Sequence, residues 1–205
     1  MSGIRKIEKK TENPFLNFYE IEAVKRDGST FPYYMASRAK KDSDLKINCG
    51  QQEDRPDGVA IFSLYGEQLD RVVLIRQYRY PLGGYIYELP AGLTEPGEDY
   101  HMTAIREMKE ETGLTFRPVK ADPALERPFY TTIGMTDECC SMVFGVSDGE
   151  ADTKDLEETE DIQVVIADRE EIRRILGEER VAIMCAYMLM HFLHNEKDPL
   201  GFLKL

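Results

Sequence analysis

One segment, GLTEPGEDYHMTAIREMKEETGL at residues 92–114, constrains this chain more than any other. Residues 98–112 have the pattern of an amphipathic helix, with Ala104 and Met108 on its apolar side. Gly113 follows, and glycine takes the left-handed geometry at a helix end without strain. The segment therefore predicts a loop that enters a helix and leaves it at a glycine stop.

The predicted helix carries three carboxylates on one side. Glu107, Glu110 and Glu111 are spaced i, i+3 and i+4, so their side chains point in one direction. Such carboxylates repel one another unless a cation lies between them, and Mg²⁺ and Mn²⁺ prefer oxygen ligands. The pattern favours a divalent-metal site that also binds substrate phosphate. The alternative is a solvated helix face on which Arg106 and Lys109 neutralise part of the charge.

Length and charge limit the possible functions. The chain has 205 residues, enough for one domain with a small appendage, and a net charge of −12. An acidic protein of this kind repels a phosphate backbone, so we expect no binding to a nucleic acid polymer. Apolar runs do not reach transmembrane length and the N-terminus lacks a secretory pattern, so no membrane association is expected.

The four cysteines, at positions 49, 139, 140 and 185, include no CxxC pair. With histidines only at 101, 191 and 194, a Cys/His zinc site is not expected. We interpret the cysteines as reduced thiols of a cytoplasmic protein.

The strand pattern suggests two parts. Residues 16–37 are rich in aromatic and β-branched residues around the turn RDGS, which predicts a β-hairpin. A polar connector at 45–57 leads us to expect an N-terminal β appendage at 1–50 and a main domain at 51–205.

The main domain alternates strands and helices. Strands are expected at 58–66, 71–80, 85–89, 115–130, 139–147 and 161–167, and helices from Asp168 and over about 179–195. The acidic stretch 148–161 is interpreted as a solvated loop. The chain is thus predicted to be of the α/β class.

The spacing of Gly92, Glu98 and the run REMKEETGL at 106–114 resembles the Nudix box at every specified position. The resemblance implies a Nudix-type α/β/α sandwich around a mixed sheet. It also implies a pyrophosphatase that hydrolyses a nucleoside diphosphate linked to another group. Divalent cations, Mg²⁺ or Mn²⁺, would be bound by Glu107, Glu110, Glu111, Glu98 and the backbone carbonyl of Ala91. Arg106 would pair with the carboxylates and orient them.

The segment before the box, LIRQYRYPLGGYIYELPAGL, is similar to the ADP-ribose and ADP-sugar pyrophosphatase branch. The resemblance implies substrate binding by Arg76, Arg79 and Glu88. An arginine can donate two parallel hydrogen bonds to a diphosphate. The alternative is that these are surface residues at strand ends.

A second segment, FYTTIGMTDE at 129–138, is similar to the loop of that branch that ends in a glutamate. Glu138 is accordingly predicted as catalytic base, with Asp137 and Glu111 as alternatives. Ile133 replaces an expected proline, which leaves open a UDP-sugar or GDP-mannose as substrate.

The predicted reaction is metal-dependent hydrolysis of ADP-ribose to AMP and ribose 5-phosphate. The family resemblance also implies a homodimer in which the N-terminal appendage contacts the partner. The other hypotheses are an ADP-ribose-sensing domain without catalysis and an enzyme that removes damaged nucleoside triphosphates. Intact box glutamates oppose the first, and the hairpin and RQYR oppose the second.

Overall fold

The computed structural model describes residues 2–48 and 55–204, which form two compact units. One unit comprises Met1–Asp57 together with Pro128–Cys140, and the other Gly58–Arg127 together with Ser141–Leu205. The expected boundary between residues 50 and 51 lies outside the described residues, as does Cys49.

The first unit contains a three-stranded antiparallel sheet in the order β1-β2-β3. The predicted hairpin is formed by β2 (Asn17–Val24) and β3 (Thr30–Ser37), and β1 (Gly3–Lys9) adds a strand that the sequence pattern did not indicate. Turn residue Gly28 has φ 86°, where a side chain would be strained. A small core covers one face of this sheet and contains Tyr19, Ile21, Met35 and Leu45. The unit also includes η1 (Asp42–Asp44) and β9 (Phe129–Tyr130).

The second unit is built on a mixed sheet in the order β11-β5-β4-β10-β8, with β6 beside β5 and β7 beside β4. The strands are β4 (Gly58–Tyr65), β5 (Arg71–Arg79), β6 (Gly84–Glu88), β7 (Ala91–Leu93), β8 (Thr115–Pro118), β10 (Cys139–Asp148) and β11 (Ile162–Ala167). Asp57, before β4, donates its N–H to Cys139, and Gly66, after β4, donates to Ser147. Strands β4 and β10 therefore run in the same direction, whereas β5 is antiparallel to β4 and β11.

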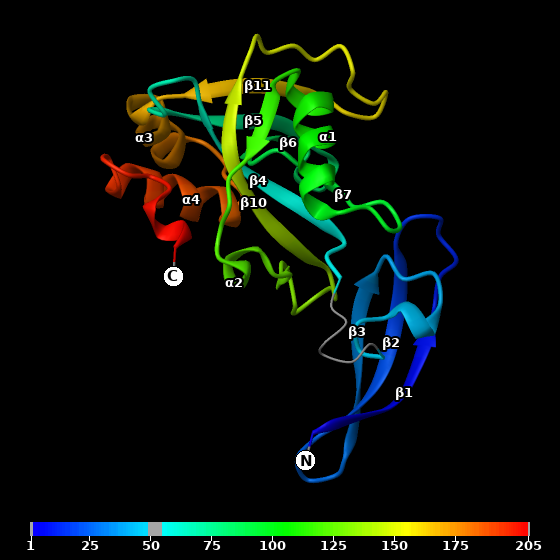
Figure 1. The fold of residues 1–205 in the computed structure, drawn as a ribbon. Helices are drawn as coiled ribbons and strands as arrows, with labels where there is room; N and C mark the ends of the chain where they lie inside the picture. Colours follow the sequence, from blue (N-terminus) through cyan, green and yellow to red (C-terminus); the bar gives the residue numbers. More distant parts are fainter. Residues whose placement is uncertain (1, 49–54, 205) are drawn as a thin grey trace. The chain divides into compact units, whose positions relative to one another are not determined.

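Helices cover both faces of this sheet (Figure 1). Helix α1 (Tyr100–Thr112) packs on one face through Ala104 and Met108, against side chains such as Ile61. Helices α3 (Arg169–Glu178) and α4 (Ile183–His194) pack on the other, against side chains such as Phe62. Successive strand residues point to opposite faces, so one strand contributes to both cores. The predicted α/β/α sandwich is confirmed.

Two stretches differ from the predicted elements. Residues 115–130 form β8, the short helix α2 (Pro123–Glu126) and β9 in place of one strand. Asp122 caps α2 by accepting from the Ala124 N–H, and proline suits its first turn. Helix α4 starts at Ile183 and not near 179, because the backbone before it pairs with Tyr87 of β6. The remaining short elements are η2 (Tyr80–Leu82) and η3 (Gly201–Leu203).

Candidate active site

The candidate site is built on α1, whose ends are set by local chemistry. Asp99 caps the N-terminus by accepting from the His101 N–H at 2.9 Å. Gly113 ends the helix at φ 72° and donates its N–H to Lys109. A Cβ at Gly113 would approach the Asp152 backbone nitrogen to 2.7 Å, so glycine is required both for conformation and for space.

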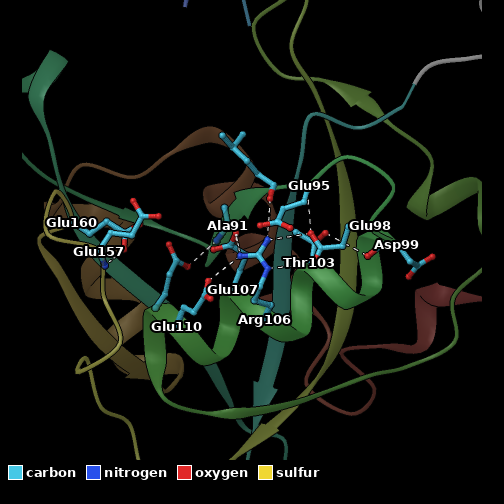
Figure 2. A network of polar contacts seen from close by, with 12 residues as sticks. Ala91, Glu95, Glu98, Asp99, Thr103, Arg106, Glu107, Glu110, Glu157 and Glu160 are labelled. Carbon is cyan, nitrogen blue, oxygen red and sulfur yellow. Dashed lines mark hydrogen bonds and ion pairs between the residues drawn. The ribbon is translucent and has the colours of Figure 1, made fainter. Parts of the chain in front are cut away.

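Arg106 connects the carboxylates of this segment (Figure 2). Its Nη1 donates to Glu107 at 2.7 Å and to Glu110 at 2.9 Å. Its Nε and Nη2 donate to the two oxygens of Glu98 at 3.3 and 3.2 Å, and Nη2 also donates to the Leu93 carbonyl at 3.1 Å. One guanidinium thus joins the loop before α1 to the helix and offsets part of the negative charge.

The carboxylates of Glu98 and Glu107 have different environments. The hydrogen bonds from Arg106 lower the pKa of Glu98 to about 2, so this side chain is a stable anion. Burial raises the pKa of Glu107 to about 7, although Arg106 acts in the opposite direction. Gly92 lies against Glu107 so closely that a Cβ there would overlap its carboxylate. The absence of a side chain at Gly92 therefore leaves room for the Glu107 carboxylate.

Glu111 is the deepest carboxylate of the segment. Its side chain is almost completely buried and accepts a hydrogen bond from the Ala91 N–H at 3.0 Å. Burial raises its pKa well above the usual value. A buried carboxylate of this kind is costly as an anion unless a cation is beside it.

A further acidic residue lies near these carboxylates and was missed by the sequence analysis. The negative charge of Glu160 raises the pKa of both Glu107 and Glu111, and Figure 2 shows Glu160 beside Glu157 near the end of α1. The stretch that holds it was interpreted as solvated. The available signal was position, since Glu160 lies two residues before Ile162, which begins β11 and pairs with Gln77 of β5.

The predicted substrate residues lie on two faces of the sheet. Arg79 Nε donates to both oxygens of Glu88, at 3.2 and 3.1 Å, and its positive charge lowers the pKa of Glu111. Arg79 and Glu88 therefore lie on the same side of the sheet as the α1 carboxylates. Arg76 is three positions earlier on β5 and faces the other way, where it donates to Gln163 at 3.0 Å and stacks over the Tyr85 ring.

Glu138 belongs to the first unit, whereas the α1 carboxylates belong to the second. Its carboxylate accepts from Arg38 Nε at 3.1 Å and from the Thr131 hydroxyl at 3.0 Å. Neighbouring Asp137 accepts from the Lys46 N–H. Both carboxylates are thus held by contacts within their own unit.

The donor set of α1 suits a hard divalent cation. Glu107, Glu110 and Glu111 offer only carboxylate oxygens, and the buried Glu111 would be stabilised as an anion by an adjacent cation. Within residues 2–48 and 55–204, no three acidic, histidine or cysteine side chains are already arranged as a ligand cluster. Arg106 donates to one oxygen of Glu107 and to one oxygen of Glu110, so the second oxygen of each carboxylate is not engaged by the guanidinium.

The thiols lie apart from this chemistry. Cys139, Cys140 and Cys185 are free, and burial raises the pKa of Cys140 and of Cys185 to about 12.

In the part of the chain that the structure describes, no helix is long and apolar enough to cross a membrane.

Residues 54–183 match the NUDIX domain. The chain belongs to the Nudix family. Among curated Nudix relatives, a putative nudix hydrolase 2 of Caenorhabditis elegans is 36% identical over 57% of this chain. An ADP-ribose pyrophosphatase of Bacillus subtilis (strain 168) is 35% identical over 46% of it. The aligned segments span about half of these relatives, 54% and 51% of their lengths.

The fold agrees with that of a solved hydrolase structure. A crystal structure of an ADP compounds hydrolase superposes with a TM-score of 0.60 and covers 98% of this chain and 96% of its own. At 18% identity, this likeness supports the fold alone. Because the superposition covers nearly the whole chain, the agreement extends to both the mixed sheet and the separate N-terminal sheet.

Proposed function

We propose that this protein hydrolyses the diphosphate of ADP-ribose, or of a related nucleoside diphosphate sugar, with Mg²⁺ or Mn²⁺ as cofactor. The observation that carries the proposal is the set of Glu107, Glu110 and Glu111 on one side of α1, with Glu111 buried against Ala91. The relatives named ADP-ribose pyrophosphatase in Bacillus subtilis and in Saccharomyces cerevisiae support this choice of substrate.

In the proposed site, the metal would be held by Glu107, Glu110 and Glu111, with Glu98 and the Ala91 carbonyl as further candidates. The bound cation would neutralise diphosphate oxygens and increase the acidity of a water molecule. Arg106 would keep Glu98 and the loop before α1 in place while the second oxygens of Glu107 and Glu110 bind the cation.

Substrate binding would use Arg79. Its guanidinium is held by Glu88 and is partly exposed, so a diphosphate could replace this carboxylate as its partner. Glu88 would then be free to accept a hydrogen bond from another part of the substrate. Arg76 would act from the opposite face of β5, either on a distant part of the substrate or by positioning the strand.

Hydrolysis requires a group that accepts a proton from water. The water oxygen forms a bond to one phosphorus while the bridging P–O bond breaks, which gives AMP and ribose 5-phosphate from ADP-ribose. Glu138 is the proposed base, and Glu160 is a second candidate because its charge acts on Glu107 and Glu111. Exchange of each for glutamine would identify the base as the variant that loses most of the rate and in which the fall in rate at acidic pH no longer follows the ionisation of that carboxylate.

The protein is further proposed to act as a cytoplasmic homodimer, with the N-terminal appendage at 1–50 as one contact. Half-exposed aromatic side chains on this sheet support a contact role, and Phe18 stacks on Tyr34 at 5.8 Å between ring centroids. The free thiols of the described cysteines suit a reducing compartment.

The proposed reaction is tested by incubating the protein and Mg²⁺ with ADP-ribose, UDP-glucose, GDP-mannose, diadenosine polyphosphate and dGTP. We expect rapid release of AMP from ADP-ribose and slow turnover of the others. Preferred cleavage of UDP-glucose or GDP-mannose would support the alternative raised by Ile133. Absence of hydrolysis across the panel would contradict the proposal, and ADP-ribose binding without cleavage would instead indicate a sensing domain.

A further inference from the structure

Gln77 of β5 is a buried polar side chain whose amide oxygen has no hydrogen-bond partner within residues 2–48 and 55–204. Only 8% of the residue is exposed, and its Oε1 is shielded from solvent. A buried acceptor without a partner destabilises a folded protein, and most buried polar groups are paired. A leucine would fill a similar volume without this cost, so the amide at position 77 requires an explanation.

The side chain of Gln77 lies on the face of the sheet that α1 covers. Val73 of the same strand belongs to the core cluster of Met108 on α1, whereas Val72 belongs to the cluster under α3 and α4. Side chains alternate between the two faces along a strand, and the pairing of β5 with β6 runs without a break over 75–79. Gln77 comes four positions after Val73 and therefore points to the α1 side.

The neighbours of Gln77 on this face are groups that act on Glu111. Arg79 lies two positions along β5, and its positive charge lowers the pKa of Glu111. On the other side, Ile162 of β11 pairs with Gln77, and Glu160 lies two residues before Ile162. The negative charge of Glu160 raises the pKa of Glu111. The Gln77 amide is thus flanked by two groups whose charges reach the α1 carboxylates.

An amide suits this position better than one more carboxylate. Glu107, Glu110 and Glu111 already bring negative charge to one side of α1, and the charge of Glu160 adds to it. The glutamine oxygen is an acceptor without a net charge, so it adds an oxygen to the site and no repulsion. Divalent cations such as Mg²⁺ keep water molecules in their coordination shell, and each of these waters donates hydrogen bonds.

We propose that Gln77 is a positioning residue of the cation site. Its amide oxygen accepts a hydrogen bond from a water in the hydration shell of the divalent cation that Glu107 and Glu111 hold. The contact fixes the orientation of this water and increases the affinity for the cation, as outer partners of metal sites commonly do. The inference rests on the cation site of the proposed function and assigns a role within it to a residue of β5.

The test is the affinity of the full-length protein for Mn²⁺ without substrate, measured from the electron paramagnetic resonance signal of free Mn²⁺. We expect Gln77→Leu to bind Mn²⁺ about tenfold more weakly than the wild type, because loss of an outer partner commonly has an effect of this size. With a chelator, its melting temperature should equal or exceed that of the wild type, since an unpaired polar group is removed. A residue needed only for folding would not lower the affinity while preserving the melting temperature.

Two further variants identify the group responsible. Gln77→Glu keeps an oxygen acceptor at the same position and should bind Mn²⁺ at least as tightly as the wild type. Gln163→Leu is the matched control, because it makes the same exchange on β11 at a residue that accepts from Arg76 on the opposite face of the sheet. Its Mn²⁺ affinity should be unchanged. Circular dichroism checks that each variant is folded.

Unchanged Mn²⁺ affinity in folded Gln77→Leu would overturn the proposal and indicate that the amide binds only a structural water. Equal weakening in Gln163→Leu, or in both exchanges at position 77, would overturn it as well. A wild type without Mn²⁺ affinity would exclude the cation site and this inference with it. Hydrolysis is assayed separately. A wild type that binds Mn²⁺ through Gln77 but leaves ADP-ribose intact would contradict the proposed reaction alone.

Discussion

At the residue scale, Glu111 combines a position on the metal-binding side of α1 with nearly complete burial. Only 3% of the residue is exposed, and its hydrogen-bond partner is the Ala91 N–H. Burial raises the pKa of Glu111, so the protonated form is favoured when no cation is present. The ionised form of Glu111 is thus unfavourable in the folded protein by itself and becomes favourable when a cation binds beside it.

The substitution Glu111→Gln should reduce turnover of ADP-ribose by roughly a hundredfold or more, because a metal ligand loses its charge. Thermal stability without metal should stay equal or rise, since the neutral amide can accept from the Ala91 N–H and cannot ionise in its buried position. Turnover and melting temperature measure the two effects. Glu178→Gln, at an exposed position of α3, is the control, and near-normal turnover of Glu111→Gln would contradict the metal-site assignment.

At the scale of the element, the loop before α1 and the helix act as one piece because Arg106 bonds to both. The guanidinium reaches Glu98 and the Leu93 carbonyl on the loop, and Glu107 and Glu110 on the helix. A lysine has one compact ammonium in place of this planar fork and could not reach all four partners. Exchange of Arg106 for lysine therefore tests whether the guanidinium connects the loop to the helix.

Arg106→Lys should lower the free energy of unfolding by roughly 1–3 kcal/mol, because carboxylates would lose hydrogen bonds while the positive charge is kept. The value is obtained from denaturant titration. Arg173→Lys on α3 serves as the comparison, since Arg173 makes one hydrogen bond to the Arg169 carbonyl. If both variants were equally stable, the connecting role of Arg106 would be excluded.

At the scale of the whole molecule, stability and metal binding should be linked through protons. Burial raises the pKa of Glu107 from 4.5 to about 7, so the metal-free folded protein holds a proton that the unfolded chain releases. This contribution to stability is complete below the unfolded value and is lost as the pH rises through about 7. A divalent cation requires the deprotonated carboxylates, so its affinity should change in the opposite direction.

The melting temperature should accordingly rise more on addition of Mg²⁺ at about pH 8 than at about pH 6, because fewer protons compete for the carboxylates. Scans with Mg²⁺ and with a chelator at both pH values measure this difference. In Glu111→Gln the rise should be much smaller at either pH. An Mg²⁺-induced rise that is larger at the lower pH would show that the sign of the linkage is wrong.

Local patterns in the sequence were sufficient for much of this protein. The hairpin of β2 and β3 and the stop of α1 at Gly113 depend on residues close together in the chain. The side on which Glu107, Glu110 and Glu111 lie follows from the helical repeat alone. These features could be predicted because neighbouring residues determine them.

Contacts between distant segments decided the rest. The strand expected at 115–130 is interrupted by α2, where Asp122 donates its N–H to the Leu203 carbonyl, and residues 180–182 pair with β6 instead of extending α4. Proximity of Glu160 to the α1 carboxylates arises because β11 pairs with β5, and this pairing is not encoded in either strand alone. The sequence by itself determined which groups the site contains and how they are spaced along α1. Only the tertiary structure decided which of them are buried, and burial, through the loss of hydration, sets their charge.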